Sequence, residues 1–313
     1  MGNRDKGRGR RGNFKFFENY GWYVPGVGQM FILLLMLLVG AVLGNVVTLL
    51  FSAAGGAEAA ADYAMLIAYP VMFIPAMLYA GALSKLASYN SPGFKLDSNN
   101  FGKAGAAGCA LLVMLATLAA GYCADIFQYL LPQMPSWMEE MLDSMTNGVL
   151  WVNFISVSIF APIFEEWLCR GMVLRGLLHK NVRPAWAIVI SAAFFALIHL
   201  NPWQAVPAFA VGCLFGYVYY RTGSLKLTML MHFTNNTFSL ILSNIDSLKE
   251  LDSWRDMLPG PLYWIIFAAC ILLLVLIVRV FARIPLQSGE GNCDRQPSLF
   301  EEQTPGGGDV VNP

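Results

Sequence analysis

Long apolar stretches recur along the chain and constrain its fold more than any other feature. A helix needs about 20 apolar residues to cross the hydrocarbon core of a bilayer. No alternating pattern repeats at the spacing of barrel strands, so helices are the spanning structure to expect. The stretches that are long enough, or nearly so, are residues 28–51, 63–84, 104–127, 148–165, 184–200, 205–220, 225–245 and 262–283. We therefore predict an all-α, multi-pass membrane protein with about eight transmembrane helices.

The composition excludes a soluble protein of this size. Of the 313 residues, 57% are hydrophobic and only 13% are charged, which is far from the balance of a soluble globular domain. The two ends differ from the rest, because residues 1–27 are basic and Gly-rich and residues 286–313 are rich in Gly, Pro and Glu. We predict that both ends are disordered tails and that residues 28–285 form one transmembrane domain.

The positive charges are distributed unevenly over the predicted loops. Of the 20 Lys and Arg residues, 18 precede the first span or follow an even-numbered one, and only Lys249 and Arg255 fall on the other side. Cytoplasmic loops of membrane proteins carry such an excess of Lys and Arg. We therefore predict an integral membrane protein with both termini in the cytoplasm.

Two adjacent glutamates end one of the apolar runs. Carboxylates at membrane depth are costly, so Glu165 and Glu166 indicate a function. Arg170 lies four residues after Glu166 and thus on the same helical face, where the two can pair. Glu165 points about 100° away, is less fully compensated, and is the candidate general base. The alternative is that both glutamates are solvated at the membrane interface.

Two of the three histidines lie in other apolar spans. His199 follows Phe195 by four residues, and His232 precedes Asn236 by four. Glu165 and His199 each lie about 22 Å along their helices from the turn that joins these helices, and therefore at a similar depth in the membrane. A single buried histidine is more often a hydrogen-bonded core residue. Glutamates, histidines and an amide on three spans at similar depth instead favour a catalytic site, since imidazole exchanges protons near pH 7 and an amide donor suits an oxyanion.

These three groups resemble the signature motifs of a known family. The pattern EExxxR begins at Glu165, FxxxH ends at His199, and HxxxN begins at His232. In this order they are similar to the motifs of the CPBP family (CAAX protease and bacteriocin processing, or Abi), which includes the type II CAAX prenyl endopeptidases. The resemblance covers about residues 148–245. It implies an intramembrane endopeptidase whose site lies in a polar cavity among the helices.

The resemblance also implies roles for individual residues. Glu165 corresponds to the glutamate that activates water, and His199 assists it. His232 and Asn236 correspond to the pair that stabilises the tetrahedral oxyanion. The supporting residues would be Glu166, Arg170 and Phe195.

The sequence leaves open whether the site binds a metal. Family members are often called metalloproteases, and nitrogen and oxygen ligands for zinc are present, although the chain lacks H-E-x-x-H. No other cofactor is indicated. The candidate ligands are Glu165, Glu166, His199 and His232.

Two functions of other classes would use the same polar cavity. One is a membrane transporter, because intramembrane charges also mark ion and substrate pathways. The other is a non-catalytic regulatory or immunity protein of the membrane. In each case the expected partners are the lipid bilayer and a membrane-associated peptide or protein, and no nucleic acid.

Overall fold

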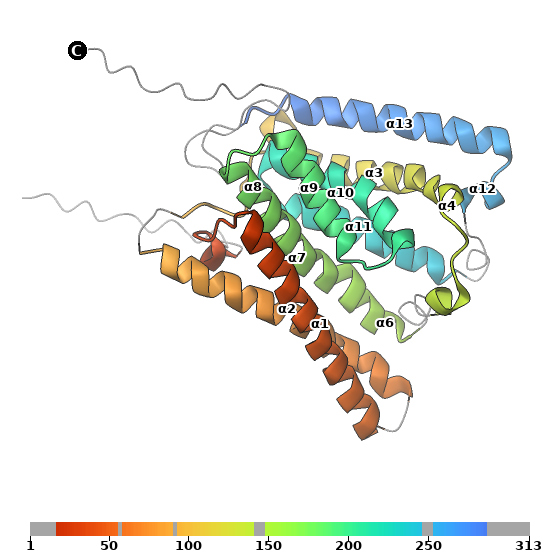
Figure 1. Ribbon diagram of the computed structural model, residues 1–313. Helices are drawn as coiled ribbons and strands as arrows, with labels where there is room; N and C mark the ends of the chain where they lie inside the picture. Colours follow the sequence, from red (N-terminus) through yellow and green to blue (C-terminus); the bar gives the residue numbers. More distant parts are fainter. Residues whose placement is uncertain (1–16, 56–57, 90–92, 141–147, 246–252, 287–313) are drawn as a thin grey trace, which may run out of the picture.

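The computed structural model describes residues 17–55, 58–89, 93–140, 148–245 and 253–286, and every regular element in these ranges is helical. The helices α1 and α2 form an antiparallel hairpin at one side, and α13 lies along the opposite edge (Figure 1). Between them runs a long central helix that includes α6, α7 and α8. The long helices outside the central one are α1 (Val27–Gly55), α2 (Glu58–Ala87), α3 (Gly105–Ala124), α9 (Pro184–Leu197), α10 (Pro202–Thr222), α11 (Leu225–Ser243) and α13 (Gly260–Ala282).

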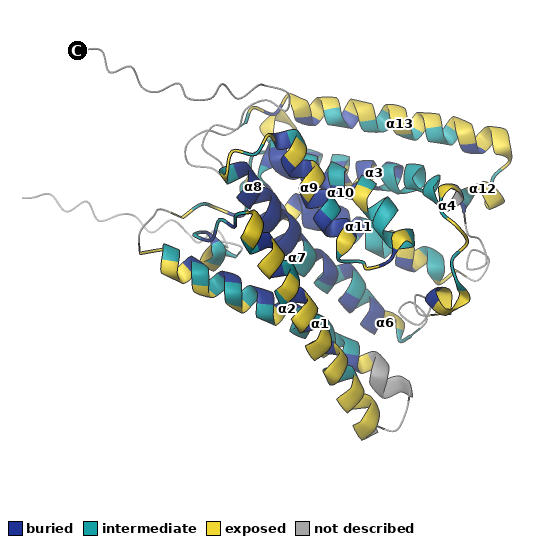
Figure 2. Ribbon diagram, viewed as in Figure 1, coloured by how far each residue is buried: buried dark blue, intermediate teal, exposed yellow. Residues whose placement is uncertain are grey.

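Each predicted span corresponds to the central helix or to one of these seven helices, so the all-α membrane fold is confirmed. The predicted count of eight crossings is not. Among the described residues, five helices are long and apolar enough to span a bilayer: Val27–Ala54, Tyr63–Ala87, Gly102–Ala124, Leu150–His179 and Gly260–Ala282. Helix α9 is apolar but has only 14 residues. The apolar side chains exposed on α1 and α13 (Figure 2) would face lipid in a membrane.

The central helix is continuous from Leu150 to His179 but is not α-helical throughout. Its successive parts are α6 (Leu150–Asn153), the π-helical η3 (Phe154–Phe160), α7 (Ala161–Glu166), the π-helical η4 (Trp167–Leu174) and α8 (Arg175–His179). The two π-helical parts flank the paired glutamates. Such i→i+5 turns are rare and are frequent at functional sites.

Pro162 leaves one backbone acceptor of the central helix without a helical donor. The N–H of Ala161 reaches back five residues to the Ser156 carbonyl. The next N–H in this pattern would belong to residue 162, and proline has none. The carbonyl of Val157 is therefore available to another donor, and it accepts a hydrogen bond of 2.8 Å from Asn236 Nδ2 on α11.

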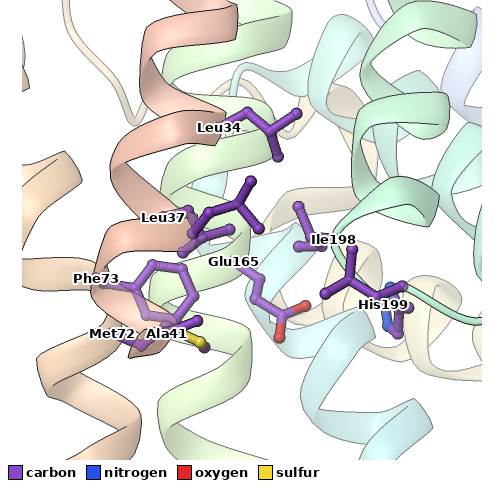
Figure 3. A pocket seen from close by; sticks show the side chains of 10 residues that line it. Leu34, Leu37, Ala41, Met72, Phe73, Glu165, Ile198 and His199 are labelled. Atoms are coloured by element: carbon purple, nitrogen blue, oxygen red, sulfur yellow. The ribbon is translucent and has the colours of Figure 1, made fainter. Parts of the chain in front are cut away.

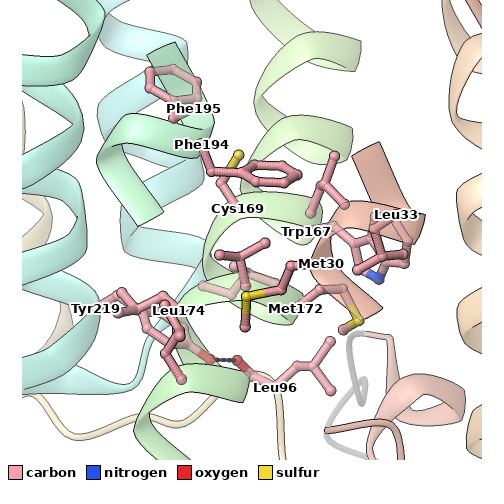
Figure 4. Close-up of a cluster of buried hydrophobic side chains, with 14 of the residues drawn as sticks. Met30, Leu33, Leu96, Trp167, Cys169, Met172, Leu174, Phe194, Phe195 and Tyr219 are labelled. Atoms are coloured by element: carbon pink, nitrogen blue, oxygen red, sulfur yellow. Dashed lines mark hydrogen bonds between the residues drawn. The ribbon is translucent and has the colours of Figure 1, made fainter. Parts of the chain in front are cut away.

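The hydrophobic core surrounds the second half of the central helix. Every residue of η4 is buried, and the central helix is the most deeply buried element in Figure 2. Trp167 and Met172 pack among side chains of α1 and α9, including Leu33 and Phe194 (Figure 4). The same cluster includes Leu96, whose carbonyl accepts a hydrogen bond of 2.8 Å from a buried tyrosine of α10. The core thus fixes the helix that carries both glutamates.

Helices α1 and α2 approach each other backbone to backbone. A Cβ atom added at Gly40 would lie 1.8 Å from the Met72 carbonyl oxygen, and one added at Gly44 would lie 3.0 Å from that of Ala68. The two glycines form a G-x-x-x-G pattern, which allows this kind of close helix contact in membranes.

Arg170 and Arg175 correct the predicted charge distribution. Both were counted as cations of a loop, but both side chains are fully buried within the central helix. Removing these two from the 18 leaves 16 Lys and Arg on the side predicted to be cytoplasmic, against two on the other. The excess persists, and the orientation of the termini stays a prediction.

Arg175 also changes the boundary of the N-terminal tail. Its guanidinium donates to the backbone carbonyls of Tyr20, Gly21 and Tyr23, and Tyr23 is buried. Residues 17–26 are therefore packed onto the domain, contrary to the prediction of a disordered tail up to residue 27. Residues 1–16 and 287–313, which make up the rest of the two predicted tails, lie outside the described residues.

Candidate active site

Glu166 and Arg170 form a buried ion pair along the central helix. Arg170 Nη1 donates to Glu166 Oε1 over 2.7 Å, and neither side chain is exposed. Arg170 Nη2 donates to the Gly212 carbonyl of α10 over 2.9 Å. The guanidinium also lies over the rings of Phe195 and Phe215, 4.7 and 5.3 Å from their centroids. Arg170 thereby connects the central helix to α9 and α10 around one carboxylate.

His232 of α11 lies between the two carboxylates. Its Nδ1 is 3.0 Å from Glu166 Oε1, and its Nε2 is 4.0 Å from Glu165 Oε2. The first distance is a hydrogen bond and the second is not. Glu166 thus fixes the orientation of the imidazole ring, and Nε2 is the nitrogen that faces Glu165.

Glu165 has one bonded and one unbonded carboxylate oxygen. Its Oε1 accepts a hydrogen bond of 2.5 Å from the hydroxyl of Tyr69 on α2. Its Oε2 is buried and has no hydrogen-bond partner among the described residues. Buried polar atoms are almost always satisfied by protein or water. Glu165 Oε2 is therefore a site for water or a ligand.

His199 lies in the turn after α9, although it was predicted inside a span that ends at residue 200. Helix α9 ends at Leu197, and Leu200 has a positive φ of 57°. The Nδ1 of His199 is 2.8 Å from the Phe195 carbonyl, so Nδ1–H donates there and Nε2 remains free to accept. Asn201 Nδ2 donates to the His199 carbonyl over 3.0 Å. The turn therefore holds this ring in a defined tautomer.

Glu165 and His199 line the same cavity, which has a volume of about 100 Å³. Figure 3 shows the Glu165 carboxylate pointing toward the His199 turn, with side chains of α1 and α2 on the other side. A cavity of this size with polar groups in its wall can hold water. The remaining wall is apolar and consists of Leu34, Leu37, Leu38, Ala41, Met72, Phe73, Ile198 and Leu200.

Asn236 lies one helical turn beyond His232 but is not part of the cavity wall. Its Nδ2 donates to the Val157 carbonyl, and its Oδ1 accepts from Asn235 Nδ2 over 3.1 Å. One of the two amide hydrogens of Asn236 remains available. The structure thus brings together Glu165, Glu166, Arg170 and His232 directly, and it places Asn236 at the edge of the group.

Sequence reasoning missed Tyr69. It lies in the second apolar stretch, and a single tyrosine there has no partner at helical spacing that would indicate a site. Only the packing of α2 against the central helix reveals its contact with Glu165.

The candidate zinc ligands do not form a metal site. In the described ranges, no group of three or more His, Cys, Asp or Glu side chains is arranged to hold a metal ion. Glu166 Oε1 already accepts from both Arg170 and His232. The arrangement fits an ion pair with a bound histidine, and we derive no catalytic step through a metal.

Comparisons with known proteins give two matches, each to part of the chain. The model of the type II CAAX prenyl endopeptidase Rce1-like family matches residues 147–238, which include the whole set of site residues on the central helix, α9 and α11. The protein named "Putative membrane peptidase YdiL" of Bacillus subtilis (strain 168) is 29% identical over 85 residues, or 27% of this chain. The aligned part spans only about a third (34%) of that relative. No solved structure matches the chain.

Both matches support a membrane endopeptidase in general, and they agree with the resemblance inferred from the three motifs. The apolar helices agree with it as well. Residues 147–238 of this integral membrane protein, less than a third of the chain, are similar to the Rce1-like family of type II CAAX prenyl endopeptidases.

Proposed function

We propose that the protein is an intramembrane endopeptidase that hydrolyses a peptide bond of a membrane-associated protein or peptide with a water activated by Glu165. One observation carries the proposal. The buried Glu165 Oε2 has no hydrogen-bond partner among the described residues and is 4.0 Å from His232 Nε2, and the Glu165 side chain lines a cavity together with His199.

The first step is attack by water. A water in the cavity donates one hydrogen to Glu165 Oε2 and the other to the free Nε2 of His199. Glu165 takes the proton as the water oxygen bonds to the carbonyl carbon of the scissile peptide. The carbonyl oxygen becomes the oxyanion of a tetrahedral intermediate. When this intermediate collapses, the C–N bond breaks and Glu165 returns the proton to the leaving amine.

The second requirement is a donor for the oxyanion. His232, hydrogen-bonded through Nδ1 to Glu166, presents Nε2 4.0 Å from Glu165 Oε2 and hence beside the attacking water, where an Nε2–H donates to the oxyanion. The available amide hydrogen of Asn236 is the second donor. Donors that are already oriented stabilise a developing negative charge strongly in a site of low polarity. Glu166 and Arg170 act by holding His232.

The test is cleavage by purified full-length protein in liposomes. Two fluorogenic peptides would be supplied under single-turnover conditions, one a farnesylated CaaX peptide and the other a peptide with an unprenylated membrane anchor. Glu165→Gln preserves the size of the side chain and should abolish cleavage without lowering the melting temperature. The matched control is Glu139→Gln, at an exposed carboxylate away from the cavity, which should cleave like the wild type.

Full cleavage by folded Glu165→Gln protein would reject the proposed role of this residue. A separate experiment distinguishes an enzyme from a transporter. It compares the membrane peptides of cells that carry the wild-type protein with those of cells that carry Glu165→Gln. A peptide that accumulates only with the variant supports the enzyme, whereas a transporter would alter the distribution of solutes without any change in peptide length.

A further inference from the structure

We infer that Tyr69 is a positioning residue for Glu165: its hydroxyl holds one carboxylate oxygen so that the other is left for water. The inference rests on the proposed function of Glu165. Tyr69 lies on α2, outside the segment of residues 147–238 that carries the three motifs.

The two oxygens of Glu165 have different surroundings. Oε1 accepts the Tyr69 hydroxyl hydrogen over 2.5 Å, and Oε2 has no partner among the described residues. The terminal torsion of a glutamate is broad and roughly two-fold, so the carboxylate would rotate without a fixed donor. The hydroxyl of Tyr69 removes this freedom. Oε2 is then the oxygen left for water.

The two neighbouring carboxylates are held by different means. Glu166 is compensated by the Arg170 cation and the His232 ring. Glu165 Oε1 instead accepts its hydrogen bond from a neutral phenol, that of Tyr69. A neutral donor orients the carboxylate and leaves its negative charge in place, as a general base requires. An arginine at the position of Tyr69 would instead form an ion pair with it.

Aromatic packing holds the hydroxyl in place. The Tyr69 ring lies 5.8 Å from the ring of Phe73, which is buried and stacks on Phe164 at 5.2 Å with an interplanar angle of 16°. Phe164 directly precedes Glu165 in the chain. The tyrosine and the glutamate are therefore fixed relative to each other through a row of three rings. Because this row does not involve the hydroxyl, Tyr69→Phe should preserve the packing.

The experiment compares Tyr69→Phe with Tyr79→Phe in the liposome cleavage assay. Tyr79 lies on the same helix, about 15 Å farther along, and its ring packs against Tyr23 at 6.0 Å. Tyr69→Phe should lower kcat about 10- to 100-fold, because a misplaced reacting group costs rates of this order. KM should stay within about two-fold of the wild type, since the cavity wall is unchanged, and Tyr79→Phe should retain wild-type kcat. A purely structural role would change KM together with kcat.

A second measurement does not depend on turnover. Melting temperatures of Tyr69→Phe, Glu165→Ala and the double variant form a cycle in which each single change removes the contact, and a direct hydrogen bond predicts that the two shifts are not additive. Wild-type kcat for Tyr69→Phe together with an inactive Glu165→Gln would overturn the inference and leave the proposed function intact. Cleavage by Glu165→Gln would reject the proposed function itself, and additive shifts would overturn the contact between the two residues.

Discussion

Arg170→Ala is expected to destabilise the protein far more than the loss of an equally short ion pair at the surface. The substitution would remove the Arg170 cation from the completely buried Glu166 carboxylate and leave it with the contact to His232 Nδ1. It would also deprive the Gly212 carbonyl of a donor. Removing one partner of a buried pair costs about 3–5 kcal/mol. This is a large part of the roughly 5–15 kcal/mol that separates a typical folded protein from its unfolded state.

The matched control is Lys226→Ala. Lys226 Nζ lies 2.6 Å from Asp97 Oδ2, but the lysine side chain is 48% exposed, and such pairs contribute about 0–1 kcal/mol. The free energy of unfolding would be measured by denaturant titration in mixed micelles, where the two variants should differ by at least about 2 kcal/mol. A double variant, Glu166→Gln with Arg170→Met, removes both charges and should recover part of the loss. Equal costs for Arg170→Ala and Lys226→Ala would refute the argument.

Three further predictions concern the site, the topology and the helix hairpin. Asn236→Ala should slow single-turnover cleavage about 100- to 1,000-fold if its free amide hydrogen serves the oxyanion; a loss below ten-fold would contradict this. In a cysteine-free background, Ser88→Cys should react with a membrane-impermeant thiol reagent from the cytoplasmic side and Ser52→Cys from the opposite side, and the reverse would reject the predicted orientation. Gly40→Ala forces a Cβ against a facing carbonyl and should cost about 1–3 kcal/mol of unfolding free energy, whereas Gly28→Ala, which meets no atom within 4 Å, should not destabilise.

The parts of the fold and site that follow local rules could be predicted from the sequence. Apolar runs indicate helices wherever a bilayer is the solvent, and the pairing of Glu166 with Arg170 follows from a spacing of four along one helix. The end of α9 was placed three residues too late, because hydropathy alone does not show that Leu200 takes a left-handed conformation and that Asn201 starts the next helix.

Contacts between helices could not be predicted in the same way. The position of His232 between two carboxylates and the hydroxyl of Tyr69 on Glu165 both depend on how the helices pack. Arg175 was assigned to a loop, because nothing in its neighbours indicates the backbone carbonyls that surround it. The carbonyl of Val157 lacks a helical donor because a π-helical turn comes just before Pro162, and it accepts from Asn236 instead. A prediction that assumes α-helical hydrogen bonds throughout this span does not show this.

The side chains of the cavity wall come from two separate parts of the chain. Leu34, Leu37 and Phe73 belong to the α1–α2 hairpin, while Glu165 and His199 belong to the family segment at residues 147–238. Under the proposed function, related proteins can diverge in the substrates they accept through changes in the hairpin alone, with the hydrolytic residues left as they are. Tyr69 limits how far the sequence of the hairpin can change. Any hairpin that takes the place of this one must still present a hydroxyl to Glu165.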